Sequence, residues 1–503
     1  MLLLGYDLGS SSIKASVIDA ATGRLVASAS APGQEMDIAS PRPGWAEQDP
    51  ELWWRYVQEA TAQLRTKVNL QEVGAIGISY QMHGLVVVDQ QHKVLRPSII
   101  WCDSRAVGIG EKAFEELGPQ VCLSDFLNSP GNFTASKLKW VKDHEPEVFA
   151  KIHRIMLPGD YLAMRLTGEI NTTVSGLSEG ILWNFREGGI ATNLLDHYGL
   201  STDMLPTLVP TFGPQGEVSA EMASVLGFRA GIPVAYRAGD QPNNAFSLNV
   251  LNPGEVAATA GTSGVVYGIN DDARYDAQSR VNTFVHVNHQ PMQPRYGVLL
   301  CVNGTGIQNS WLRNKLLAGD ISYPDMNRLA AEVPVGAEGV RVLPFGNGAE
   351  RVLSNQQVGG QVLGLDFNRH DRRHLLRAAQ EGIVFALNYG MEVMKSMGMG
   401  VDTVRAGDAN MFLSPVFRQT FANVTGAVVE LYNTDGAQGA ARGAGVGAKV
   451  YAALPEAFTG LQATQTIEPK ASERDATQAA YEAWHRALKT ALRKQEEAKP
   501  VVS

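Results

Sequence analysis

Cysteine is scarce in this chain, and long hydrophobic runs are missing. The 503 residues include three cysteines, Cys102, Cys122 and Cys301, which are far apart and form no C-x-x-C pair. An odd, dispersed set of this kind argues against a disulfide framework or a zinc site and predicts a reducing, cytoplasmic location. No apolar run approaches membrane-spanning length, and the apolar start at residues 1–8 is too short for a signal peptide.

An excess of positive charge is also lacking. The chain has 43 basic and 51 acidic residues, which gives a net charge of −8. Proteins that bind nucleic acids or anionic membranes need basic patches, so neither partner is expected. The P-loop signature G-x-x-x-x-G-K-[ST] does not occur, which excludes that phosphate site. A phosphate-binding turn of another kind is still compatible with an acidic protein.

The chain is too long for a single ordinary core, and two of its segments repeat one pattern. A strand, a turn of small polar residues and a second strand are predicted over residues 2–19 and again over 256–267. The repeat predicts two domains, 1–248 and 249–503, each of which opens with such a hairpin. Two phosphate-binding hairpins that face each other across a cleft would hold a nucleotide tail. Two unrelated Gly-Ser hairpins are the alternative interpretation.

The two turns carry groups that suit a phosphate. Asp7 ends the first strand, and the turn after it offers backbone amides, three hydroxyls and then a lysine. Such amides bind phosphate, and Asp7 can hold a hydrated magnesium ion. The candidate phosphate-binding residues are Ser10, Ser11, Ser12 and Lys14 in the first turn and Gly261, Thr262 and Ser263 in the second.

A carboxylate follows the predicted strand over residues 233–239. The small Gly239 leaves Asp240 open to a cleft, and uncharged hydrogen-bonding side chains come directly after it. This setting suits a general base that acts on an alcohol. An ordinary polar loop is the alternative, because Asp, Asn, Gly and Pro are all common in loops.

Two further predicted strands, over residues 73–79 and 97–101, also end in polar groups. α/β sheets place ligands at such strand ends, and an imidazole at one of them can hydrogen-bond sugar hydroxyls. The competing interpretation of His83 is an ordinary loop histidine. The candidate substrate-binding residues at the three strand ends are Gln81, Met82, His83, Trp101, Arg105, Asp240 and Gln241.

The motif at residues 443–448 would wrongly indicate a dinucleotide-binding site. Residues 443–448 fit G-x-G-x-x-A, the pattern of a dinucleotide-binding turn, but they do not lie at a strand-to-helix turn, because Asp435-Gly436 already supplies a turn before them. We therefore predict a helix of small residues that allows close packing. Longer helices are expected after Asp49 and Asp371, which suit N-caps, and the tail 499–503 is expected to fray.

In this order, these motifs resemble the FGGY family of carbohydrate kinases, and within it the xylulokinases. The matching segments are 5–11, 45–54, 81–84, 133–140, 239–240, 261–264 and 360–381. The resemblance covers essentially the whole chain. It is weakest at residues 405–410, where the family commonly has a glycine triplet under the adenosine and this chain has Asp408, and where residues 411–413 look inserted.

The resemblance implies an α/β protein with an actin-like ATPase fold, in which two ribonuclease-H-like domains surround a deep cleft. It also implies ATP as co-substrate, Mg²⁺ held by Asp7 through water, and phosphorylation of D-xylulose to D-xylulose 5-phosphate with Asp240 as general base. The sugar is expected against the first domain. The adenosine is expected near Gly304, Gln308, Gly407, Ala409 and Asn410.

Two rival functions stay open at this point. Another sugar kinase of the same family would act on gluconate, glycerol or a different ketose. A non-catalytic, actin-like nucleotide-binding scaffold would hydrolyse ATP without regard to sugars, and it would leave His83 and Asp240 without a purpose. A homodimer is compatible with the sequence.

Overall fold

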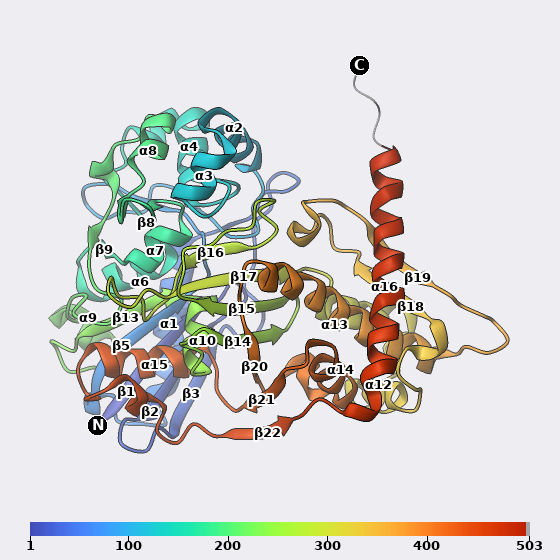
Figure 1. Ribbon diagram of the computed structural model, residues 1–503. Coiled ribbons are helices and arrows are strands. Elements are labelled where there is room, and N and C mark those ends of the chain that lie inside the picture. The colour runs from blue at the N-terminus through green and yellow to red at the C-terminus, as the bar shows by residue number, and fades with distance from the viewer. Residues whose placement is uncertain (499–503) are drawn as a thin grey trace.

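The computed structural model describes residues 1–498, so the expectation for residues 499–503 lies outside the described part of the chain. The first half is built on a five-stranded sheet with the order β13-β5-β1-β2-β3 (Figure 1). These strands are β1 (Leu2–Leu8), β2 (Ile13–Asp19), β3 (Leu25–Ala31), β5 (Val73–Tyr80) and β13 (Val234–Gly239). β1 is antiparallel to β2 and parallel to β5, with Leu4 opposite both Val17 and Ile76.

The second half repeats this topology in a seven-stranded sheet of order β16-β17-β15-β14-β20-β21-β22. Its strands are β14 (Gly254–Ala260), β15 (Gly264–Asn270), β16 (Asn282–Val285), β17 (Tyr296–Val302), β20 (Val401–Gly407), β21 (Val428–Tyr432) and β22 (Ala463–Ile467). β14 and β15 form the hairpin, β17 continues it antiparallel, and β20 and β21 follow in parallel on the other side. Each half therefore has a ribonuclease-H-like core, and together the halves form an actin-like fold.

Helices cover both faces of the first sheet, which explains why β1 is apolar along nearly its whole length. Leu4 packs in the core that includes Trp53 of α1 (Pro50–Arg65), whereas Leu3 packs in the core that includes Ala440 of α15 (Gly436–Gly447). Because strand residues alternate between faces, Asp7 lies on the α15 side. α15 belongs to the second half in sequence, yet Figure 1 shows it against β1, β2 and β5.

α15 approaches the first sheet as closely as backbones allow. A Cβ atom on Gly5 would overlap the carbonyl oxygen of Ala437, and one on Gly77 would overlap that of Ala440. On the helix side, a Cβ on Gly447 would overlap the carbonyl oxygen of Ala235. The prediction of a close-packing helix of small residues, rather than a dinucleotide turn, is confirmed.

The remaining helices of the first half surround the sheet or build an outer layer on it. They are α2 (Val107–Leu117), α3 (Pro119–Asp125), α4 (Thr134–His144), α5 (Pro146–Phe149), α6 (Pro158–Thr167), α7 (Val174–Glu179), α8 (Thr192–Tyr198), α9 (Ala220–Leu226) and α10 (Asp240–Ser247). Those of the second half are α11 (Gly306–Trp311), α12 (Tyr323–Ala331), α13 (Arg372–Ser396), α14 (Pro415–Thr425) and α16 (Ala471–Ala498).

Short strand pairs complete the structure. They are β4 (Glu47–Gln48) with β7 (Ser98–Ile99), β6 (Val86–Val88) with β8 (Arg154–Met156), β9 (Asn171–Thr172) with β12 (Thr207–Leu208), β10 (Trp183–Asn184) with β11 (Gly189–Ile190), and β18 (Arg341–Phe345) with β19 (Gly359–Leu363). No helix among residues 1–498 combines the length and apolar character needed to cross a bilayer.

Several local predictions can be checked against these elements. Asp49 and Asp371 cap α1 and α13 with their side chains, as expected. The predicted strand over 97–101 is shorter, since β7 has two residues. The residues after Gly239 form α10 rather than a polar loop, so Asp240 is the first residue of a helix. Residues 411–413 belong to a 3₁₀ turn, of which Met411 and Phe412 are buried.

Gly5→Ala tests the contact between α15 and the first sheet. The added methyl group has no room beside the Ala437 carbonyl, so we expect the free energy of unfolding to fall by roughly 1–3 kcal/mol and the melting temperature to fall by several degrees. Gly108→Ala in α2 is the control, because a Cβ there meets nothing within 4 Å and alanine favours a helix. Equal melting temperatures for the two variants would contradict the close contact.

Candidate active site

A cavity of about 590 Å³ is lined by both halves of the chain and gathers most of the residues that the sequence predicted. It is bounded by the β1–β2 turn, the start of α10 and the β14–β15 turn. The predicted residues in its wall are Asp7, Ser10, Ser11, Ser12, Lys14, Gln81, Met82, His83, Trp101, Asp240, Gln241 and Ser263. A hollow of this size suits a small-molecule substrate.

Asp240 is placed to accept a proton near neutral pH. Burial raises the pKa of its carboxyl to about 7, and repulsion by the nearby Asp7 acts in the same direction. Hydrogen bonds from Gln241 favour the charged form and oppose this rise. A general base works best when its pKa lies close to the working pH, so the environment of Asp240 suits this role.

Asp7 is the second carboxylate of the cavity. The hydroxyl of Ser79 donates a 2.7 Å hydrogen bond to its Oδ1, and the start of α15 lies so close that a Cβ on Gly436 would be 2.5 Å from its Oδ2. Burial raises the pKa of Asp7, whereas the Ser79 hydrogen bond and Lys14 lower it. Residues 1–498 contain no cluster of three or more metal-ligating side chains. A single carboxylate such as Asp7 suits the hydrated kind of magnesium site, in which water and phosphate supply the other ligands.

His83 presents a hydrogen-bond acceptor to the cavity. Its Nδ1 lies 2.9 Å from the backbone carbonyl oxygen of Glu179, and since a carbonyl only accepts, Nδ1 carries the proton. Burial, reinforced by the nearby Lys137, lowers the pKa of His83 to about 3, so the ring is neutral. Nε2 is therefore left with a lone pair that can accept from a sugar hydroxyl.

Gly239 lies where β13 meets the loop of residues 81–84, which is called the sugar loop below because a sugar is expected there. A Cβ at this position would lie 2.6 Å from the Cγ of Met82 and 2.6 Å from the Oε2 of Glu179. Glu179 is a fully buried acid whose carboxylate oxygens lack hydrogen-bond partners among the described residues. Burial raises its pKa well above the usual value, and Asp240 adds to this effect. No pattern in the sequence indicated that Glu179 would lie beside the cavity.

The predicted adenosine residues are divided between two places. Gly304 and Gln308 line a second, mostly apolar cavity of about 360 Å³ beside α11, β18 and α13. The other predicted adenosine residues, Gly407, Ala409 and Asn410, lie outside both cavities. The side-chain amide nitrogen of Asn410 is close to the second turn, because a Cβ atom on Gly261 would lie 3.7 Å from it. The backbone carbonyls of Gly261 and Thr262 point to the start of α11, where they accept hydrogen bonds from the N–H groups of Gly306 and Ile307.

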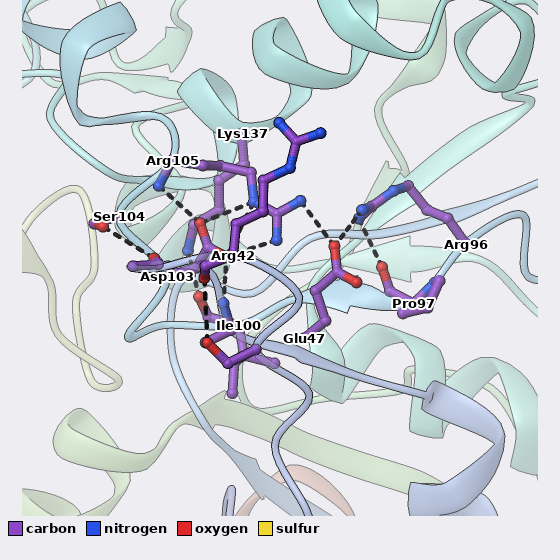
Figure 2. A network of polar contacts seen from close by, with 12 residues as sticks. Arg42, Glu47, Arg96, Pro97, Ile100, Asp103, Ser104, Arg105 and Lys137 are labelled. Atoms are coloured by element: carbon purple, nitrogen blue, oxygen red, sulfur yellow. Dashed lines mark hydrogen bonds and ion pairs between the residues drawn. The ribbon is translucent and has the colours of Figure 1, made fainter.

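Arg105, one of the candidate substrate-binding residues, does not line this cavity. Its side chain is 1% exposed and lies between Asp103 and Glu47, at 2.7 and 2.8 Å, in the network shown in Figure 2. The guanidinium also stacks on Trp45, with 3.8 Å from Cζ to the ring centre. Its charge and its packing surface are thus engaged inside the first half, and Arg105 is not among the residues that line the cavity. Trp101, in contrast, lines the cavity and is 45% exposed.

Lys137 of α4 is a buried residue that sequence reasoning did not single out. Its Nζ donates to the backbone carbonyl oxygens of His83 at 2.8 Å and of Ile100 at 3.0 Å. His83 has a positive φ of 62°, so this lysine holds the sugar loop in an unusual conformation. The available signal was a lysine within the apolar stripe of the segment 133–140.

Other residues missed from the sequence come mainly from the second half. The cavity is also lined by Asn132, Phe133, Val265, Asn282, Leu299, Cys301, Asn303, Ala349, Glu350, Arg351 and Asn355. The cavity that holds the expected sugar residues His83, Met82 and Asp240 is therefore lined by the second half as well. No local sequence pattern could have shown this, because the side chains converge only through the packing of the two sheets.

Two family models match the chain in succession. Residues 2–247 match the N-terminal domain of the FGGY family of carbohydrate kinases, and residues 256–451 match its C-terminal domain. The xylulose kinase of Escherichia coli strain K12 is 31% identical over 492 residues, which cover 96% of this chain and 98% of that protein.

Solved structures share the fold. A xylulose kinase from Rhodospirillum rubrum superposes with a TM-score of 0.86 at 27% identity and covers 97% of this chain and 99% of its own. A gluconate kinase from Lactobacillus acidophilus has a TM-score of 0.89 at 23% identity, with 98% of both chains covered, and this shows the fold alone.

Lys137→Met tests how the sugar loop is held. The substitution leaves two buried carbonyls without a donor, so we expect the free energy of unfolding to fall by roughly 1–3 kcal/mol. Lys139→Met, on the more exposed face of the same helix, is the control and should have a smaller effect. Denaturant unfolding of both variants measures the difference, and equal losses would contradict the role of Lys137.

The same variant has an expected pH signature. Burial lowers the pKa of Lys137 from 10.5 to about 7 in the folded protein. Between these values the unfolded chain binds a proton that the folded chain does not, so the stability of the parent protein should rise with pH over this window. Lys137→Met should show a flatter dependence, and an unchanged slope would contradict the assignment.

Proposed function

Because this chain belongs to the FGGY family of carbohydrate kinases, and is thus a sugar kinase, we propose that it transfers the γ-phosphoryl group of ATP to D-xylulose to give D-xylulose 5-phosphate. The xylulose kinases among its relatives support this choice of sugar, and the kinase family supports ATP as the donor. We further propose that Asp240 is the general base.

One observation carries the proposal. The carboxylate of Asp240, the sugar loop at His83 and the serines of the β1–β2 turn line a single cavity, which Ser263 of the second turn also lines. Phosphoryl transfer requires positioning and charge neutralisation more than covalent chemistry, so one base, one metal and several donors are sufficient. The pKa of about 7 at Asp240 adds a base that is partly ionised at neutral pH and fully ionised above it.

The reaction follows from this arrangement. The carboxylate of Asp240 takes the proton from the terminal hydroxyl of the sugar as the hydroxyl oxygen attacks the γ-phosphorus of ATP. A new P–O bond forms to the sugar, the bond to the β-phosphate oxygen breaks, and ADP leaves. Ser10, Ser11, Ser12 and Lys14 would bind the phosphates from the first half, while Ser263 would do so from the second.

Magnesium would neutralise charge on the β- and γ-phosphates, and Asp7 is the residue that would hold its water shell. The two carboxylates have different tasks because their surroundings differ. Burial raises the pKa of Asp7, but the hydrogen bond from Ser79 and the charge of Lys14 favour its ionised form, and we assign this carboxylate to the ion. Asp240 has no basic partner within residues 1–498, and we assign it the role of proton acceptor.

A sugar acid such as gluconate is the second candidate substrate, and one specific observation favours it. The cavity contains the guanidinium of Arg351, for which no ion pair is found among residues 1–498. A carboxylate on the substrate would satisfy this cation.

A panel of acceptors tests the proposed substrate. D-Xylulose should stimulate ADP release from MgATP well above the rate without sugar, and D-gluconate, glycerol and other ketoses should stimulate it less. Coupled detection of ADP measures these rates. Strongest stimulation by another acceptor would replace D-xylulose, and a rate indifferent to every sugar would exclude a sugar kinase.

The pH dependence tests the base. Asp240 must be ionised to accept a proton, and burial raises its pKa to about 7, so kcat/KM for D-xylulose should fall as the pH drops through about 7. Asp7→Asn removes the nearby negative charge and should move the midpoint to lower pH, whatever it does to the rate itself. An acid limb with the same midpoint in both proteins would show that another group titrates.

A further inference from the structure

Arg351 brings an unneutralised positive charge into the cavity from the second half. It lies in the 3₁₀ turn Arg351–Leu353, and its half-buried side chain lines the same hollow as Asp240 and His83. Within residues 1–498, its guanidinium has no hydrogen bond to an acceptor and no acidic group within ion-pair distance. A partly desolvated cation in such a position would gain from an acceptor on a bound molecule.

The nearest acidic groups are occupied or neutral. Both carboxylate oxygens of Glu350 accept from the backbone N–H of Asn303, at 3.0 and 3.1 Å. The neighbouring thiol of Cys301 has a pKa raised to about 12 by burial, so it carries no charge at neutral pH. The guanidinium therefore keeps its hydrogen-bonding capacity for a bound molecule.

The position of Arg351 indicates which part of a substrate it would meet. Its Cζ lies 5.7 Å from the ring centre of Phe133, a residue of the first half, and Phe133 packs edge-on against His83 with ring centres 4.8 Å apart. Phe284 closes the same aromatic group at 5.4 Å from His83. Arg351 thus lies on the side of the cavity that the second half forms, and it faces the sugar loop.

We propose that Arg351 is a specificity-determining residue that donates hydrogen bonds to an sp² oxygen of the acceptor sugar, either the carbonyl of a ketose or the carboxylate of an aldonate. The proposal rests on the sugar kinase function and adds the group that the second half recognises. A guanidinium can only donate, whereas the Nε2 of His83 can only accept. An oxygen without a proton would bind Arg351, and a hydroxyl would bind His83.

This pairing discriminates between a ketose and the corresponding polyol. Reduction of the D-xylulose carbonyl gives D-arabinitol or xylitol, which keep the terminal hydroxyl for phosphorylation but replace the sp² oxygen with a hydroxyl. Hydrogen bonds from a charged group contribute more than neutral ones. The oxygen of the new hydroxyl can still accept from the guanidinium, but its proton finds no acceptor there, because a guanidinium only donates. The parent enzyme should therefore prefer the ketose, and this preference should depend on Arg351.

The experiment compares kcat/KM for D-xylulose, D-arabinitol and D-gluconate in the parent enzyme, Arg351→Gln and Arg351→Lys. Arg351→Gln should lower kcat/KM for D-xylulose by roughly tenfold or more, mainly through KM, and change that for D-arabinitol much less. Arg351→Lys should retain part of the preference. Arg369→Gln is the control, since Arg369 pairs with Glu338 outside the cavity and should leave all three values unchanged.

The possible outcomes distinguish a ketose carbonyl from a carboxylate as the bound oxygen, and they also show whether the proposal fails. A larger loss for D-gluconate than for D-xylulose would assign the oxygen to a carboxylate, and the reverse would assign it to a ketose. Equal losses for ketose and polyol, or a matching fall in ATP hydrolysis without sugar, would overturn the proposal, because Arg351 would then act on the phosphates or on folding. If the parent enzyme phosphorylated no acceptor, the proposed function would fail, and calorimetric binding of D-xylulose and D-gluconate to the parent and Arg351→Gln would still test this residue.

Discussion

The close packing of α15 on the first sheet fixes this segment of the second half against the first half. Gly5 and Gly77 leave room for the backbone carbonyls of the helix, and no larger residue would fit at either position. This contact brings Gly436, at the start of α15, against the carboxylate of Asp7. The phosphate turn of the first half is thereby fixed beside a segment that belongs to the second half in sequence, and a single cavity serves both.

Within that cavity, environment assigns different tasks to chemically similar groups. Asp7 and Asp240 are both buried carboxylates that repel each other, but Ser79 and Lys14 favour the charged form of Asp7. Asp240 has a pKa near neutrality instead. In the proposed site a similar division would apply to the sugar, for which neutral His83 would offer an acceptor and Arg351 would offer donors. A donor on one side of a site and an acceptor on the other orient the bound substrate and also contribute to its affinity.

The sequence predicted much of the fold because local patterns were strong. Alternating strands around Ser10–Ser12 and Gly261–Gly264 indicated both hairpins, and the duplication predicted the two related sheets. Asp240 was found because a strand ending in a glycine exposes the next side chain. The ion pairs of Arg105 could not be predicted, because its partners Glu47 and Asp103 converge only in three dimensions. Arg351 was missed for the same reason, since its position depends on how the second half packs against Phe133.

Single-turnover phosphoryl transfer by Asp240→Asn, with D-xylulose and MgATP both saturating, is the decisive measurement for the proposed base. The asparagine keeps the size and most hydrogen bonds of the aspartate but cannot accept the proton. The proposed mechanism predicts transfer slowed by roughly a hundredfold or more, while the dissociation constants of sugar and nucleotide change only slightly. Transfer at close to the parent rate, with both substrates bound, would contradict the assignment of Asp240 as the base.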